Sequence, residues 1–99
     1  DSSQARSLIY QKYLLAEDTE TQVEYLFLLE DLFKKDKLTN IFSKALSNNL
    51  KKIGIENIPK KYKEIAESRI ERDEKFVLGK VKYNDKVLHQ SKIMKFYLD

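Results

Sequence analysis

Four glutamates and one histidine are the side chains of this 99-residue chain best suited to acid–base or metal chemistry. The glutamates recur at steps of three or four residues, which places them along one edge of a helix. Carboxylates in that arrangement could hold a divalent cation or supply an acid and a base. Di-iron bundles pair such glutamates with a histidine three residues on, and that histidine is absent here. We therefore interpret them as a solvated face of a helix; they are Glu64, Glu67, Glu71 and Glu74.

Other catalytic or cofactor chemistry lacks its usual residues. His89 is the only histidine and the sequence has no cysteine, so the common zinc donor sets are missing. Gly54 and Gly79 are its only glycines, and neither belongs to a nucleophile elbow or a phosphate-binding loop. Composition alone leaves a Ser-His-Asp arrangement open. We predict a non-enzymatic protein without cofactor or metal, and we infer no small-molecule substrate.

Positive charge is concentrated in the later part of the sequence. Residues 1–33 contain two basic and seven acidic residues, whereas residues 34–99 contain seventeen basic and nine acidic ones. Such asymmetry suggests an acidic partner, and the alternative is that the lysines serve solubility alone. We predict that nine residues of the basic part bind the partner: Lys60, Lys61, Lys63, Lys80, Lys82, Tyr83, Lys86, Lys92 and Lys95.

The C-terminal lysines are interleaved with aromatic residues, among them Phe76, Tyr83 and Phe96. Cations for phosphates and rings for base stacking are what a single-stranded nucleic-acid surface needs. Arginine, which makes bidentate phosphate contacts, is absent after Arg72. Packing of these rings in the core is the competing interpretation.

The composition is that of a soluble protein, with 41% hydrophobic and 35% charged residues. No apolar run approaches the roughly 20 residues that span a bilayer, and residues 1–7 do not form a secretory signal. The lack of cysteine fits a reducing compartment. We expect an intracellular protein of the cytoplasm or nucleus, with no membrane partner.

Hydrophobic periodicity predicts a helix over residues 2–17 and a second helix that ends near Lys35. The second begins at a capping box, formed either by Thr19 with Gln22 or by Thr21 with Glu24. Its central segment, residues 23–33, is apolar around most of the helix circumference, so it must be enclosed by its neighbours. We expect this helix to lie at the centre of the domain.

A third helix, capped by Asp36 or Thr39, has an apolar stripe that extends to Ile53. Gly54 then suits the left-handed conformation that often ends a helix. After a loop at residues 55–59, a fourth helix begins near Lys60.

The C-terminal quarter has two interpretations. Residues 76–83 alternate partly like a strand, and Asn84-Asp85 could form a hairpin turn before Val87. Alternatively Gly79 ends or kinks the fourth helix and Asp85 caps a fifth. We favour the helix, and so predict one all-α domain over residues 1–99, with four or five antiparallel helices in a helical-hairpin or bundle arrangement.

Two segments of the chain are similar to each other. Residues 7–14 align with residues 39–46 at an offset of 32, with isoleucine on isoleucine, tyrosine on phenylalanine, lysine on lysine and leucine on leucine. Helical-hairpin repeats have periods near this value. We therefore expect an internal repeat of helix pairs, and a plain bundle is the alternative.

Residues 5–14 and the pair Leu29-Glu30 resemble the TPR-like half-a-TPR (HAT) repeats of RNA-processing scaffolds. In that family the first helix reads roughly Ala-Arg-x-Ile-Tyr-x-Arg-x-Leu, and the second carries tryptophan and tyrosine where this chain has Val23 and Leu26. The resemblance covers about residues 5–67, although the partner helix of the second unit departs from the pattern. It implies an assembly scaffold with protein partners in RNA processing.

We therefore predict a protein-interaction or scaffold module. A partner helix or an acidic peptide would dock in a groove between helix pairs, with lysines steering its approach. The alternative is an RNA- or DNA-binding accessory domain that uses the lysine-rich C-terminal half.

Overall fold

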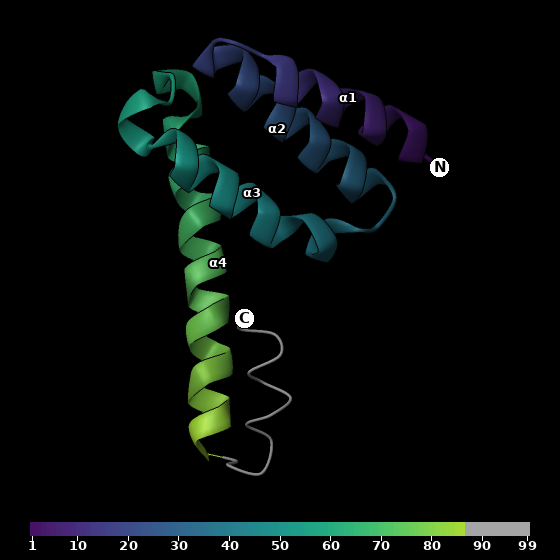
Figure 1. The fold of residues 1–99 in the computed structure, drawn as a ribbon. Coiled ribbons are helices and arrows are strands. Elements are labelled where there is room, and N and C mark those ends of the chain that lie inside the picture. Colours follow the sequence, from purple (N-terminus) through teal and green to yellow (C-terminus); the bar gives the residue numbers. More distant parts are fainter. Residues whose placement is uncertain (87–99) are drawn as a thin grey trace.

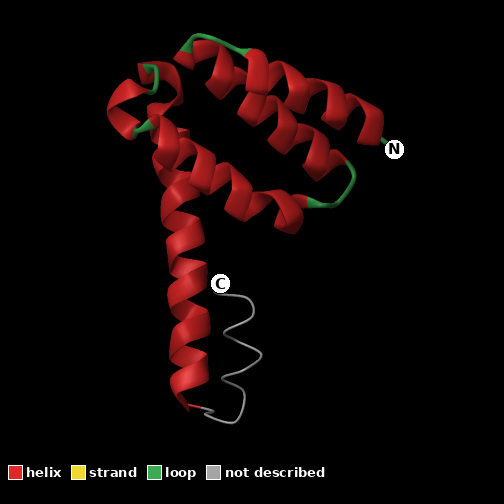
Figure 2. Ribbon diagram, in the orientation of Figure 1, coloured by secondary structure: helices red, strands yellow, loops and turns green. Residues whose placement is uncertain are grey.

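The computed structural model of the protein describes residues 1–86, with side chains described for residues 1–75. This part of the chain is helical and contains no strand (Figure 2). Its elements are α1 (Ser3–Leu15), α2 (Thr19–Lys35), α3 (Thr39–Ile53), the short 3-10 helix η1 (Ile55–Asn57) and α4 (Lys60–Lys86). The all-α prediction is confirmed for these residues, and none of their helices is long and apolar enough to cross a membrane.

The first three helices pack side by side, and α2 lies between α1 and α3 as expected (Figure 1). Successive helices of this group run antiparallel, whereas α4 crosses α3 steeply and extends away from the group (Figure 1). The connection between α3 and α4 explains this departure from a wholly antiparallel arrangement. Gly54 adopts φ +89° at the end of α3, and η1 follows it. Ile58, directly after η1, is buried in the core.

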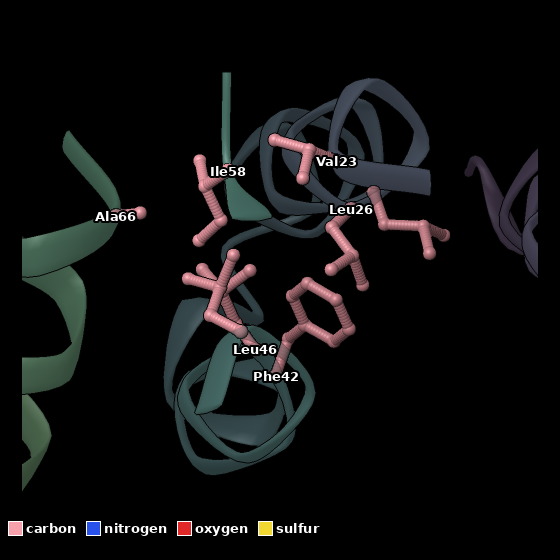
Figure 3. Close-up of a cluster of buried hydrophobic side chains, with 8 residues drawn as sticks. Val23, Leu26, Phe42, Leu46, Ile58 and Ala66 are labelled. Carbon is pink, nitrogen blue, oxygen red and sulfur yellow. The ribbon is translucent and has the colours of Figure 1, made fainter. Parts of the chain in front are cut away.

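The core is built by α2 and α3, with additions from the segment that follows (Figure 3). Side chains of the two helices face one another, and Ile58 and Ala66 close one side of the cluster. Phe33 of α2 also stacks on Phe42 of α3, with ring centroids 4.8 Å apart. The buried apolar residues are Val23, Leu26, Leu29, Phe42, Leu46, Leu50, Ile58 and Ala66.

No residue of α1 is fully buried. Ile9 and Tyr13 are its contribution to the hydrophobic packing, and both are only partly buried. The helix thus covers the core without supplying a wholly buried side chain.

The predicted caps of α2 and α3 were wrong. Asp18 caps α2, because its carboxylate accepts the Thr21 N–H over 2.9 Å, and a charged acceptor favours a helix N-terminus. Neither Asp36 nor Thr39 caps α3: Asp36 is the C-cap residue of α2, and Thr39 is the first residue of α3. Gly54 has positive φ at the end of α3, as predicted.

The turn between α2 and α3 places a lysine in the left-handed region. Lys37 has φ +60°, and its N–H donates to the Lys34 carbonyl over 3.0 Å. The Leu38 N–H donates to the Phe33 carbonyl over 2.8 Å, which completes a Schellman motif. Glycine is the usual residue at this position, so Lys37 is strained here.

In the C-terminal quarter, α4 continues through residues 76–83 and Gly79 to Lys86. The prediction that Gly79 ends the fourth helix was therefore wrong. The hairpin predicted over residues 76–83 with a turn at Asn84-Asp85, and the fifth helix predicted to be capped by Asp85, both extend past Lys86, outside the described residues.

Candidate protein-interaction surface

The first group of predicted binding residues lies in the first turn of α4. Lys60 is exposed and Lys63 is half-buried. The Lys61 ammonium, however, lies 2.9 Å from a carboxylate oxygen of Glu20 and 3.8 Å from one of Glu24. The hydrogen bond to Glu20, with the attraction between the two charges, raises the pKa of Lys61. Lys61 therefore forms an ion pair between the start of α4 and the start of α2.

The second group of predicted binding residues comprises Lys80, Lys82, Tyr83 and Lys86, which lie in the last turns of α4. At 1.5 Å per residue, Lys80 is about 30 Å along the helix from Lys60. The structure therefore places the two groups toward opposite ends of α4 rather than in one cluster. Lys92 and Lys95 lie outside the described residues.

The glutamates of α4 are exposed, as the interpretation of a solvated face requires. Lys75 lies 2.9 Å from Glu71 on the same helix, and Lys51 of α3 lies 3.4 Å from Glu74. Among the side chains that the structure describes, no group of three histidine, cysteine or acidic residues could hold a metal ion.

A shallow depression lies where α2, α3 and α4 meet. Its volume is about 170 Å³, counting space open to solvent. Its lining residues are Glu30, Phe33, Thr39, Phe42, Ser43, Leu46 and Arg72. We assign no function to this depression.

Among the side chains that the structure describes, the largest group of exposed apolar ones lies on α1. Leu8 is 53%, Tyr10 49%, Leu14 61% and Leu15 80% exposed. On a helical wheel these residues fall on the arc opposite Ile9 and Tyr13, together with Ser3, Gln4, Ser7 and Gln11. We call these eight exposed residues the outer face of α1.

The outer face of α1 carries no charge, although 35% of the residues in the chain are charged. Arg6 and Lys12 are the charged residues of α1, and both fall outside this arc. The hydrophobic periodicity that predicted this helix did not reveal the second apolar arc. The absence of charge between Ser7 and Gln11 was the available signal.

Polar contacts at both ends of α1 fix the rotation of the helix about its axis. At its start, Asp36 accepts the Ser2 N–H over 2.9 Å and pairs with the Arg6 guanidinium, which also lies 4.8 Å from the centroid of Phe33. The Ser2 hydrogen bond, with the contact to Arg6, lowers the pKa of Asp36 despite partial desolvation.

At the other end of the helix, Tyr13 donates a hydrogen bond from its hydroxyl to Oδ1 of Asn49 over 3.0 Å. Partial burial, with a smaller contribution from Tyr10, raises the pKa of Tyr13. The Gln22 amide also donates to the Ala16 carbonyl over 3.1 Å. With these contacts in place, the outer face is held toward solvent.

Comparisons with known protein families, curated proteins and solved structures gave no match. The positions aligned in the expected repeat differ in burial: Leu14 is 61% exposed, whereas its counterpart Leu46 is 1% exposed. Tyr10 is likewise exposed and Phe42 buried. The repeat and the HAT resemblance therefore stay predictions, and the function has to be argued from the surface.

Proposed function

We propose that this chain is a non-enzymatic protein-interaction module that binds a helix of a partner protein along α1. The observation that carries the proposal is the uncharged outer face of α1, on which four large apolar side chains are exposed. A surface helix normally shows charged and polar residues on the side away from the core. Depletion of charge together with exposed leucine and tyrosine is instead typical of the centre of a protein interface.

The apolar residues of the outer face form two short rows along the helix, and polar, uncharged residues lie between the rows. Leu8 and Leu15 are seven residues apart, so they lie almost directly above one another on the helix. Tyr10 and Leu14 are four residues apart and form a parallel row. Two such rows offer the spaced anchors that a partner helix uses in helix-to-helix docking.

Other exposed apolar residues provide a contrast. Leu28, Ile41 and Ile65 are 41%, 68% and 38% exposed, and each is on a different helix. Single apolar residues of this kind are normal on soluble proteins and need no partner. Ile41 therefore serves as a matched control for the leucines of α1.

The experiment that tests the proposal is selection of binders from a displayed library of helix-forming peptides. Selected peptides are expected to bind the chain, to lose at least tenfold in affinity for Leu15→Gln, and to keep their affinity for Ile41→Gln. Leu15 is 80% exposed, so its replacement should leave the fold intact, which circular dichroism checks. Equal binding to both variants, or no enrichment of peptides, would refute the proposal.

We also propose that the lysines of α4 attract an acidic segment of the partner and so speed its association. Lys60 and the pair Lys80 and Lys82 are the residues to change, because Lys61 is already paired with Glu20. Replacement of these three by glutamate is expected to slow association with an acidic partner at low salt, and the difference should shrink as salt rises. An unchanged association rate would remove the steering role.

Nucleic-acid binding is the competing function, and the same preparation tests it. A steep fall in the affinity for a homopolymer RNA with increasing salt would support it. No binding at low salt would exclude it.

A further inference from the structure

The surroundings of the outer face of α1 indicate the chemistry of the partner. We propose that the occupant is an amphipathic helix of another protein whose apolar stripe is flanked by basic residues. This inference rests on the proposed function and adds the charge of the helix that docks on α1; the acidic segment that the lysines of α4 steer is a separate part of the same partner. It is carried by the acidic residues that border the exposed end of the outer face.

The most exposed part of the outer face lies next to acidic residues. Leu14 and Leu15 end α1, and Glu17 and Asp18 follow them directly in the connection to α2. Both acidic residues are exposed. The unsatisfied carbonyl groups at the end of α1 add partial negative charge at this point.

The internal ion pairs leave this acidic border in place. Lys61 pairs with Glu20 and Glu24, and Arg69 pairs with Glu30 through contacts of 2.5 and 3.3 Å. None of the ion pairs found among the described side chains involves Glu17 or Asp18. Asp18 does cap α2 through Thr21, but its carboxylate keeps its charge and its exposure.

Near the Leu15 end, one exposed cation of α1 stands against the two exposed acidic residues. Lys12 lies beside the arc of the outer face, roughly one turn before Leu15. Arg6 is turned inward, where it pairs with Asp36. At the Leu15 end, Glu17 and Asp18 therefore attract the basic flanks of a partner helix. The same two residues would repel an acidic flank.

A second copy of this chain fits the outer face less well. The strip is about 20 Å long and roughly 10 Å wide, the dimensions of one face of a short helix. A second copy would bring its own acidic border in place of a basic flank. A single basic amphipathic helix matches the strip in width and in charge.

Two synthetic peptides test the inference. Both carry leucines at helical spacing along one side; the flanking positions are lysine in the first peptide and glutamate in the second. Binding is measured by fluorescence anisotropy at low and at moderate salt, with the full chain. The lysine-flanked peptide is expected to bind at least tenfold more tightly than the glutamate-flanked one, and its advantage should decrease with salt.

Three variants locate the binding. Leu15→Gln should lower the affinity for the lysine-flanked peptide at least tenfold, and Glu17→Lys should lower it by several fold. Ile41→Gln should leave this affinity unchanged. Glu17→Lys should also improve the binding of the glutamate-flanked peptide, a change that a general loss of stability could not produce.

The possible failures are distinguishable. Equal or tighter binding of the glutamate-flanked peptide, still sensitive to Leu15→Gln, would overturn the basic partner and leave the interaction module standing. Insensitivity of both peptides to Leu15→Gln would overturn the docking face itself. A dimer seen in analytical ultracentrifugation that Leu15→Gln dissociates would replace the basic helix by a second copy.

Discussion

The hydroxyl of Tyr13 donates a hydrogen bond to Oδ1 of Asn49 over 3.0 Å, and this contact joins α1 directly to α3. We expect Tyr13→Phe to lower the free energy of unfolding by about 1 kcal/mol, since the ring stays while one partly buried hydrogen bond is lost. Urea denaturation measures the change. The control is Tyr10→Phe, because Tyr10 is 49% exposed on the outer face. Equal effects of the two substitutions would contradict the role of the bond.

The environment of Asp36 makes the attachment of α1 sensitive to acid. Its pKa is lowered by the Ser2 N–H and by Arg6, so its contribution to stability is present above the ordinary pKa of about 3.9 and is lost as pH falls through the lower pKa of the folded state. Asp36→Asn is expected to reduce the urea midpoint at neutral pH and to flatten the decline of that midpoint below pH 4.

Asp31→Asn provides the control for this measurement, since it removes an exposed carboxylate from the same helix. It should leave the neutral midpoint within error of the original chain. If both substitutions changed the midpoint alike, net charge rather than the contact with Ser2 and Arg6 would be responsible.

Relief of backbone strain at Lys37 should stabilise the protein. Lys37→Gly is expected to raise the free energy of unfolding by roughly 0.5–1 kcal/mol, because the cost of a left-handed side-chain residue exceeds the entropy that glycine adds to the unfolded chain. The same replacement at Lys44, an exposed residue in the interior of α3, should instead destabilise by about 1 kcal/mol. Thermal and urea unfolding of the two variants decide the sign, and destabilisation by both would refute the assignment of strain.

Ser47 is fully buried, and its hydroxyl has no hydrogen-bond partner among the residues that the structure describes. Ser47→Ala should therefore stabilise the protein by about 1 kcal/mol, since it removes an unpaired polar group from the core. Ser47→Val should destabilise by roughly 1–3 kcal/mol, because the site is already closely packed. A loss of stability in the alanine variant would indicate that the hydroxyl is satisfied in solution.

Local sequence signals predicted the helices well. The start of α4 near Lys60, the end of α2 near Lys35 and the positive φ of Gly54 all follow from residues close in sequence. The cap at Asp18 was missed because two hydroxyl-based capping boxes lie just after it, and the sequence does not show which acceptor the helix terminus uses.

The candidate surface depended on information that periodicity lacks. A helix with apolar residues on two arcs can place either arc against the core, and the choice for α1 is made by Tyr13 with Asn49 and by Arg6 with Asp36, both long-range contacts. The pairing of Lys61 with Glu20 is also a long-range contact, so the sequence pattern did not predict it. The steep departure of α4 depends on the conformation at Gly54 and the burial of Ile58, which a pattern of apolar spacing does not contain.

Because α1 supplies no wholly buried side chain, it contributes less to the buried core than α2 and α3 do. The amide protons of α1 should then exchange with solvent through partial opening, at a lower free energy than those of α3. A binder on the outer face would slow that exchange only if it holds α1 in its docked position. Hydrogen exchange in α1 is therefore a reporter of occupancy that requires no label on the partner.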